Sequence, residues 1–205
     1  MHTIVLATAN PGKIRELMFL LQRFDPALEV KGLQDYPEIG PIEETGTTFE
    51  ENAMIKAVAA SEATGLVAVA DDSGLEVDAL GGEPGVYSAR YSGAGATDAS
   101  NNEKLLRNLA HVPPAERTAR FRCVMVARAP GGQTLQTQGT WEGRIVDIPQ
   151  GEGGFGYDPL FLDPEIGRTA AQMEPELKNR RSHRGRAMEK LLQKWPAFWR
   201  TISHP

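Results

Sequence analysis

The sequence has 205 residues, of which 40% are hydrophobic and 24% are charged, and its formal net charge is −5. This length fits one large domain or two small lobes. A membrane span needs about 20 consecutive apolar residues, and no apolar run in the sequence is nearly that long. The acidic balance argues against a general nucleic-acid-binding protein. The single cysteine, Cys123, excludes an internal disulfide and a zinc site built from cysteines. We therefore expect a cytoplasmic enzyme that has neither a membrane nor a nucleic-acid partner.

The chain begins with a predicted strand and a predicted helix, and their junction is a candidate anion site. Residues 3–9 centre on an apolar run, as in a strand that is buried on both faces. Asn10 suits the N-cap of the following helix, and Pro11 suits its first position. A helix start presents N–H groups and the positive end of the helix dipole to an anion. A bound phosphate would explain Lys13 in this first turn, whereas a solvated lysine is the simpler alternative.

A second helix is predicted after a loop-like segment that carries the acidic pair Glu43-Glu44. The residues Thr48-Phe49-Glu50-Glu51 have the form of a capping box, which predicts a helix from about residue 49 to residue 64. Asn52 and Lys56 share one face of this helix because they are four residues apart. A short strand is predicted over residues 28–32, before the loop.

Two adjacent carboxylates, Asp71 and Asp72, follow a short apolar segment that is predicted to be a buried strand over residues 66–70. Ser73-Gly74 is predicted to turn the chain sharply after them. Neighbouring residues of a strand point to opposite faces, so the two carboxylates are expected to point in opposite directions while the chain stays extended. Carboxylates at the end of an apolar strand are costly unless they are paired, hydrogen-bonded or bound to a metal. The alternative is an aspartate that only caps the turn.

The middle of the chain is predicted to contain a helix over residues 99–110 and an antiparallel hairpin. The two strands of the hairpin would span residues 118–129 and 133–141, with Pro130-Gly131-Gly132 as the turn. Cys123 lies inside the first of these strands. We therefore interpret it as a small core residue and not as a nucleophile.

Two later segments suit the binding of a nucleobase. The pattern Gly-x-Gly-x-x-Gly over residues 151–156 is no dinucleotide fingerprint, because Tyr157-Asp158-Pro159 follows it and prevents a helix from starting there. Its glycines still let the backbone approach a flat ligand, and Phe155 offers a stacking face. A short helix is predicted near residues 176–180, and Ser182 suits the N-cap of a final helix. Basic residues cluster around this junction: Lys178, Arg180, Arg181, His183, Arg184 and Arg186.

Carboxylates, lysines and an aromatic loop together indicate a site for a nucleoside triphosphate with a divalent cation, for which Mg²⁺ is the best candidate. The motifs that carry these groups resemble the inosine triphosphate pyrophosphatase family. In chain order they are Thr8-x-Asn10-x-x-Lys13, Glu43-Glu44-Thr45-Gly46, Thr48-Phe49-x-Glu51-Asn52-Ala53, Ala70-Asp71-Asp72-Ser73-Gly74-Leu75, Pro84-Gly85-Val86-Tyr87-Ser88-Ala89-Arg90-Tyr91, Gly154-Phe155-Gly156-Tyr157-Asp158-Pro159 and Ser182-His183-Arg184-Gly185. The similarity extends from about Ile4 to Leu192.

The resemblance implies an elongated two-lobed α/β fold around a central mixed β-sheet flanked by helices. It also implies that residues 1–205 form a single two-lobed domain, that the protein is a homodimer and that its activity depends on Mg²⁺. The reaction implied is the cleavage of ITP, dITP or XTP to the monophosphate and pyrophosphate, which would remove these non-standard purine nucleotides from the nucleotide pool.

The resemblance further assigns roles to individual residues. Asp72 would act as general base and metal ligand, with Glu43 as a further ligand. The residues expected to bind the substrate are Thr8, Ala9, Asn10, Pro11, Gly12, Lys13, Lys56, Ser73, Phe155, Gly156, Tyr157, Asp158, Lys178, His183 and Arg184.

Selection of the base is expected to follow from polarity. Hypoxanthine and xanthine carry a 6-oxo acceptor. Donors from Lys178 and from the turn Ser182-His183-Arg184 would bind this oxo group and leave the 6-amino group of adenine unpaired. Phe155 would stack on the base, and the side chain or the backbone of Asp158 would fix one edge of it. Two other functions remain open: a Maf-type nucleotide pyrophosphatase that acts on other modified nucleotides, and a nucleotide-binding module without catalytic activity.

Overall fold

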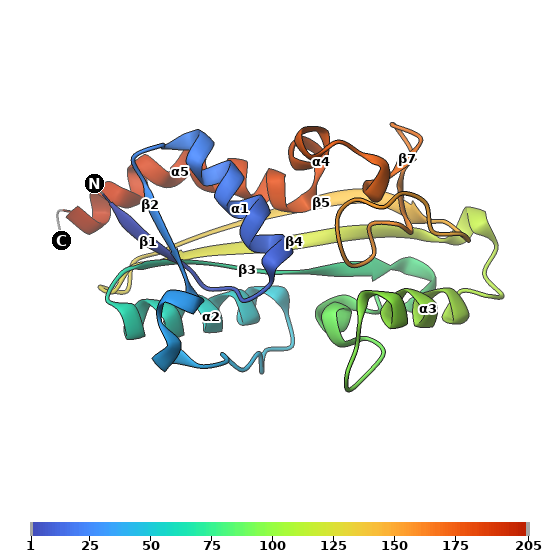
Figure 1. Ribbon diagram of the computed structural model, residues 1–205, viewed down its shortest axis with the longest axis horizontal. Coiled ribbons are helices and arrows are strands. Elements are labelled where there is room, and N and C mark those ends of the chain that lie inside the picture. Colours follow the sequence, from blue (N-terminus) through green and yellow to red (C-terminus); the bar gives the residue numbers. More distant parts are fainter. Residues whose placement is uncertain (1, 204–205) are drawn as a thin grey trace. The chain divides into compact units, whose positions relative to one another are not determined.

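The computed structural model describes residues 2–203, and its strands form one mixed seven-stranded sheet (Figure 1). The strands are hydrogen-bonded in the order β2-β1-β3-β4-β5-β6-β7. They span Thr3–Leu6 (β1), Glu29–Gly32 (β2), Val67–Val77 (β3), Thr118–Arg128 (β4), Thr134–Ile145 (β5), Phe161–Asp163 (β6) and Arg168–Thr169 (β7). The α-helices span Pro11–Phe24 (α1), Phe49–Thr64 (α2), Asp98–Asn108 (α3), Pro175–Arg181 (α4) and His183–Ser203 (α5). A mixed sheet flanked by helices confirms the predicted α/β class.

The contacts divide the chain into two compact units. The first comprises the chain up to Asp72, Cys123–Gly139 and the chain from Arg184 onward, and the second comprises Ser73–Arg122 and Thr140–His183. Met1, His204 and Pro205, which the predicted domain includes, lie outside the described residues. Among the described residues, no helix is long and apolar enough to cross a membrane.

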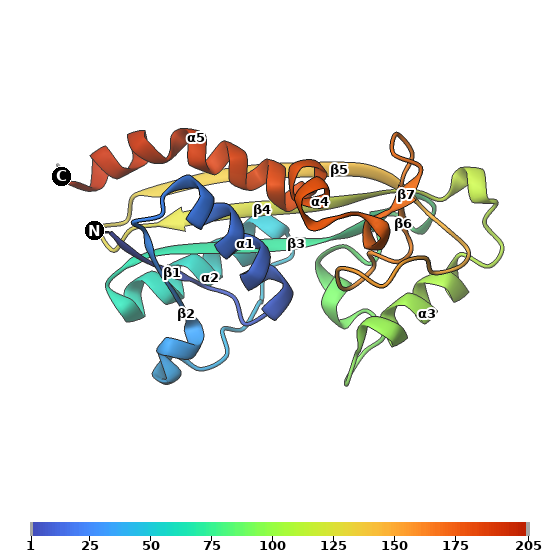
Figure 2. The same ribbon diagram turned by 45° about the horizontal axis from the view of Figure 1, so that its top comes forward.

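The first unit is a three-layer arrangement, with α1 and α5 on one face of its strands and α2 on the other (Figures 1 and 2). β1 pairs in parallel with both β2 and β3, for example Ile4 with Val67. Both faces are therefore covered, which explains why residues 4–7 are continuously apolar and almost completely buried. The core on the side of α1 and α5 includes Leu17, Leu21, Val69, Met125, Met188, Leu191 and Trp195.

Local signals set the helix starts in this unit, and these predictions are confirmed. The Asn10 side chain accepts hydrogen bonds from the amides of Gly12 and Lys13 at 2.9 and 3.2 Å, so that α1 begins at Pro11. Thr48 and Glu51 form the predicted capping box, and α2 ends at Thr64 because Gly65 adopts a left-handed conformation with φ of 67°.

The predicted sharp turn at Ser73-Gly74 is wrong, because β3 continues through both carboxylates as far as Val77. Extended backbone can pass through Asp71 and Asp72 since each has partners of opposite charge on its own face of the strand. The alternative of an aspartate that only caps a turn is wrong as well, because β3 does not turn after Asp72.

The second unit packs α3, α4 and the outer strands around one apolar core. Leu105 of α3 and Leu109, the C-cap residue of this helix, are completely buried and pack in a cluster with Leu75, Trp141 and Phe161. The predicted helices and the hairpin are confirmed with shifts of a few residues, and β5 continues beyond its predicted end, as far as Ile145. In the first unit, α5 likewise runs on through Pro196, and Trp195 and Phe198 are buried in the core.

Candidate active site

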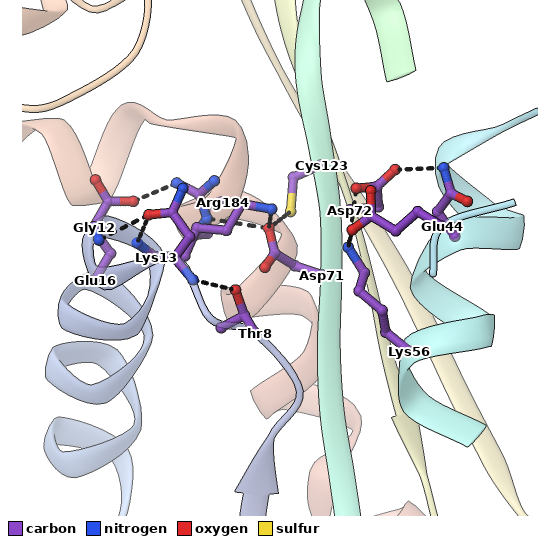
Figure 3. Close-up of polar contacts among 12 residues, drawn as sticks. Thr8, Gly12, Lys13, Glu16, Glu44, Lys56, Asp71, Asp72, Cys123 and Arg184 are labelled. Carbon is purple, nitrogen blue, oxygen red and sulfur yellow. Dashed lines mark hydrogen bonds and ion pairs between the residues drawn. The ribbon is translucent and has the colours of Figure 1, made fainter. Parts of the chain in front are cut away.

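Asp71 and Asp72 point to opposite faces of β3, as the strand geometry predicts (Figure 3). Asp71 is completely buried and faces Lys13 and Arg184, whereas Asp72 is 5% exposed and faces Lys56. The two carboxylates therefore have separate surroundings although they are adjacent in the chain.

Asp72 lies in a polar cluster formed with α2 and with the loop that precedes it. Its Oδ1 accepts a hydrogen bond from Lys56 Nζ at 3.1 Å, and its Oδ2 accepts one from Asn52 Nδ2 at 3.3 Å. Lys56 Nζ also donates to Glu44 Oε1 at 2.6 Å, so one ammonium group bridges two carboxylates. Asn52 and Lys56 reach the same carboxylate because they share a helix face, as expected from their spacing. The amide of Gly46 donates to Asn52 Oδ1 at 2.8 Å, which fixes the orientation of that side chain.

Burial and charge act in opposite directions on the protonation of this cluster. Burial raises the pKa of Asp72 above its ordinary value, although the charges of Lys56 and Lys13 partly oppose the shift. Burial alone would lower the pKa of Lys56, but the carboxylates of Asp71, Asp72 and Glu44 raise it, so Lys56 stays charged. Asp72 is thus a carboxylate with an increased affinity for a proton beside a permanent cation.

On the other face, Asp71 holds two cations in place. Its Oδ2 lies 2.9 Å from Lys13 Nζ and 3.4 Å from Arg184 Nε, and Arg184 also binds Glu16. Burial favours the neutral form of Asp71, but Lys13 and Arg184 outweigh it and hold the pKa of this carboxyl group well below its usual range. Cys123 Sγ lies 4.0 Å from the same oxygen and is completely buried, and burial raises the pKa of the thiol. Cys123 is therefore a core residue, as predicted.

Side chains just before α1 accept hydrogen bonds from the backbone amides at the start of this helix. Besides the two amides that Asn10 caps, the amide of Asn10 donates to Thr8 Oγ1 at 3.2 Å. Ala9, Asn10 and Pro11 are exposed, whereas Thr8 and Gly12 are buried. A phosphate at this helix start would therefore compete with Asn10 for the amides of Gly12 and Lys13.

In the second unit, the aromatic loop is built on a buried ion pair. Asp158 Oδ2 accepts hydrogen bonds from Lys178 Nζ at 2.6 Å and from the amide of Phe155 at 2.8 Å. The same Nζ lies 5.0 Å from the centroid of the Phe155 ring, within cation–π range. Asp158 and Lys178 are 3% and 7% exposed, which makes this pair a fixed part of the loop.

The residue after Phe155 is held by α3, a contact that the sequence analysis missed. Gly156 donates its amide hydrogen to Asp98 Oδ2 at 2.7 Å and accepts a hydrogen bond from Asn102 Nδ2 at 3.0 Å. Tyr157 is buried, and its hydroxyl group donates to the carbonyl oxygen of Ser88 at 2.9 Å. No local pattern indicates such contacts, because they join residues more than 50 positions apart.

The basic cluster around α4 and α5 does not have a common set of partners. Arg181 binds Asp163, Arg184 binds Asp71, and the His183 ring stacks on Phe121 with centroids 4.8 Å apart. These contacts leave the predicted roles of His183 and Arg184 in base recognition untested. Ser73, also predicted to bind the substrate, lies in β3 and is half-buried.

The structure brings Glu44 rather than Glu43 to Asp72. Glu43 is exposed, whereas Glu44 is half-buried and shares the ammonium group of Lys56 with Asp72. Two carboxylate oxygens that converge on one cation fit the donor set of Mg²⁺, which proteins commonly bind through one or two carboxylates together with substrate phosphates. Within residues 2–203, no group of three or more His, Cys, Asp and Glu side chains is arranged to hold a metal by itself.

Comparison with known proteins shows the family of this chain. A model of the Ham1 family matches residues 4–194. The chain belongs to the Ham1 family. This result confirms the resemblance drawn from the sequence motifs.

Individual relatives match this Ham1-family chain over nearly its whole length. It is 58% identical to the dITP/XTP pyrophosphatase of Nitratidesulfovibrio vulgaris, with 97% of this chain and 98% of that protein covered. It is 51% identical to the dITP/XTP pyrophosphatase of Geobacillus kaustophilus, with 95% of each covered. The solved structure of a HAM1 protein from Coxiella burnetii is 43% identical and matches with a TM-score of 0.87, covering 96% of this chain and all of that one.

Proposed function

We propose that this chain hydrolyses ITP, dITP and XTP to the nucleoside monophosphate and pyrophosphate. The names of its relatives, one of them 58% identical, support this function. The observation that carries the proposal in the structure is the buried carboxylate of Asp72, which is hydrogen-bonded to Asn52 and paired with Lys56. Such a carboxylate suits proton abstraction from water beside a cationic group that can hold a phosphate.

In the proposed reaction, Asp72 accepts a proton from the water that attacks the α-phosphorus, and pyrophosphate leaves. A general base works best when its pKa lies near the operating pH, and burial shifts the pKa of Asp72 in that direction. Lys56 and Lys13 would leave their carboxylate partners and bind phosphate oxygens, which positions the triphosphate and offsets its charge. Asp71 would keep Lys13 close to the substrate until then.

The residues proposed to hold Mg²⁺ are Asp72 and Glu44, with Glu43 as the ligand that the sequence motif alone suggested. The structural reason for preferring Glu44 is its contact with the same Lys56 ammonium group. When bound, the ion would supply positive charge against the phosphates and lower the pKa of water.

The Phe155 loop is proposed to bind the base. The ring of Phe155 would stack on the purine, and the Asp158–Lys178 pair would present a charged group at its edge. A donor such as Lys178 matches the 6-oxo group of hypoxanthine and xanthine and mismatches the 6-amino group of adenine. A mismatch of this kind in a polar site can reduce activity by about 10⁴-fold.

Release of pyrophosphate from ITP, XTP, GTP, dUTP and ATP, with and without Mg²⁺, tests the function. We expect turnover of ITP and XTP that requires Mg²⁺ and that Asp72→Asn abolishes. A preference for dUTP would instead indicate a Maf-type activity, and binding of ITP without turnover would indicate a module that only binds nucleotides. Either result would contradict the proposal.

We also propose that the protein works as a homodimer in the cytoplasm. The family resemblance supports the dimer, and the single cysteine suits a reducing compartment. Light scattering of the purified protein would test the oligomeric state.

A further inference from the structure

The N-terminal part of α3 binds the aromatic loop through both backbone polar groups of Gly156. The Gly156 amide donates to Asp98 Oδ2 at 2.7 Å, and the Gly156 carbonyl accepts from Asn102 Nδ2 at 3.0 Å. Asp98 is the first residue of α3, and Asn102 follows four positions later, so both side chains lie on the same helix face. We refer to Asp98 and Asn102 as the α3 clamp.

Gly156 has a backbone conformation that needs such a restraint. Its φ of 63° lies in the left-handed region, which glycine adopts freely but does not favour over its other conformations. A Cβ atom at this position would meet nothing within 4 Å, so no close approach by a neighbouring atom requires glycine here, and its role lies in the backbone conformation. The two hydrogen bonds of the α3 clamp restrain this conformation at both polar groups of Gly156.

The clamp acts directly beside the proposed base-binding ring. Phe155 is restrained on its other side by the bond from its amide to Asp158, and Lys178 lies over its face. α3 also holds a second segment, because Asn101 binds the backbone of Ser88, Ala89 and Ser92 at 3.4, 3.2 and 2.8 Å. α3 thus contacts the backbone of Gly156, which follows the Phe155 ring, and also the segment around Ser88, whose carbonyl oxygen accepts the hydrogen bond from the Tyr157 hydroxyl group.

We propose that Asp98 and Asn102 are positioning residues for base recognition: they hold the Phe155–Gly156 turn in its binding conformation before the nucleotide arrives. This inference rests on the proposed function, in which Phe155 stacks on the purine. A preordered loop does not have to lose conformational freedom on binding, so its affinity for the ligand is higher. Loss of the clamp should therefore weaken binding of the base and leave the chemistry at Asp72 unchanged.

The test compares Asp98→Ala and Asn102→Ala with wild type in steady-state kinetics on ITP. We expect each variant to raise KM by about threefold to tenfold with kcat within about twofold, because a charge-assisted or neutral hydrogen bond to the loop is lost. Asp98→Asn keeps an acceptor oxygen and should restore most of the affinity. Glu103→Ala removes an exposed carboxylate from the same helix and serves as the charge-matched control, which should leave KM unchanged.

Inhibition by inorganic tripolyphosphate distinguishes a loss of base positioning from a general structural defect of the variant. It lacks a base, so its inhibition constant should not change in the clamp variants. A parallel loss of tripolyphosphate binding, or a fall in kcat with unchanged KM, would overturn the inference. The melting temperature of each variant identifies any loss that is due to unfolding.

Phe155→Ala distinguishes failure of this inference from failure of the proposed function. If Phe155→Ala raises KM while the clamp variants do not, the clamp is refuted and the base site stands. If Phe155→Ala itself leaves KM unchanged, the base site is refuted and the clamp with it. If the base site and the clamp are both correct, the double variant Phe155→Ala/Asp98→Ala should raise KM little more than Phe155→Ala alone does. The reason is that the clamp acts through the ring that has been removed.

Discussion

Replacement of Lys56 by Met should make the nucleotide-free protein bind Mn²⁺ more tightly while it lowers the activity. The Lys56 ammonium group lies 3.1 Å from Asp72 Oδ1 and 2.6 Å from Glu44 Oε1, between the two carboxylates proposed to hold the metal. A divalent cation at this position must therefore displace an internal cation. The lysine that would compete with the metal in the free protein is the same one that is proposed to bind phosphate in the complex.

The distances set the size of the effect. Two unit charges separated by about 4 Å interact by about 4 kcal/mol at the effective dielectric constant of about 20 that suits sites near a protein surface. The displaced ammonium group recovers part of this energy by moving towards water, so only a fraction appears as lost metal affinity. We expect Lys56→Met to lower the dissociation constant of Mn²⁺ by about tenfold, which corresponds to about 1.4 kcal/mol.

Electron paramagnetic resonance of free Mn²⁺, titrated with protein in the absence of nucleotide, measures this constant. Lys31→Met is the matched control, because it removes an equal charge from a side chain that is 40% exposed. Mn²⁺ should also raise the melting temperature of Lys56→Met more than that of wild type, since a ligand stabilises the state that binds it. Unchanged or weaker Mn²⁺ binding by a folded Lys56→Met protein would refute the competition.

Three further changes test other parts of the structure. Glu44→Gln should raise the Mg²⁺ concentration needed for half-maximal activity by about tenfold, whereas Glu43→Gln should change it less than twofold; the reverse order would restore Glu43 as the ligand. Asp163 is 1% exposed, and its hydrogen bonds from Trp141 and Arg181 lower its pKa below 3.8 although burial opposes them. The ionised group therefore stabilises the fold above that pH, and this contribution is lost as the pH falls through the lowered pKa, so Asp163→Asn should cost about 1–3 kcal/mol in urea unfolding at pH 7 and clearly less at pH 3. Native Cys123 should not react with a chromogenic disulfide reagent until the protein unfolds, and rapid labelling of the native protein would contradict its buried position.

The elements that local chemistry determines were the ones that the sequence predicted best. α2 begins and ends where the capping box and Gly65 place it, and Asn10 and Pro11 define the start of α1. These signals act over three or four residues, so they can be recognised without knowledge of the fold.

The parts that were predicted wrongly or missed from the sequence depend on distant partners. The continuation of β3 through Asp71 depends on Arg184, which lies 113 residues further along the chain. The sequence motif suggested Glu43 as a metal ligand, whereas the proposal of Glu44 rests on its pairing with Lys56, and the restraint on Gly156 depends on Asp98, 58 residues earlier. The sequence shows where a carboxylate could take part in a site. Which cation it pairs with depends on the packing of distant segments.

The placement of two carboxylates on one continuous strand makes the length of the chain before them critical. Side chains alternate along β3, so inserting or deleting a single residue between Val67 and Asp71 would exchange the environments of the two carboxylates. The aspartate proposed as the base would then meet Lys13 and Arg184, and its neighbour would meet Lys56. Such an indel would preserve every functional residue type in the protein and still dismantle the site.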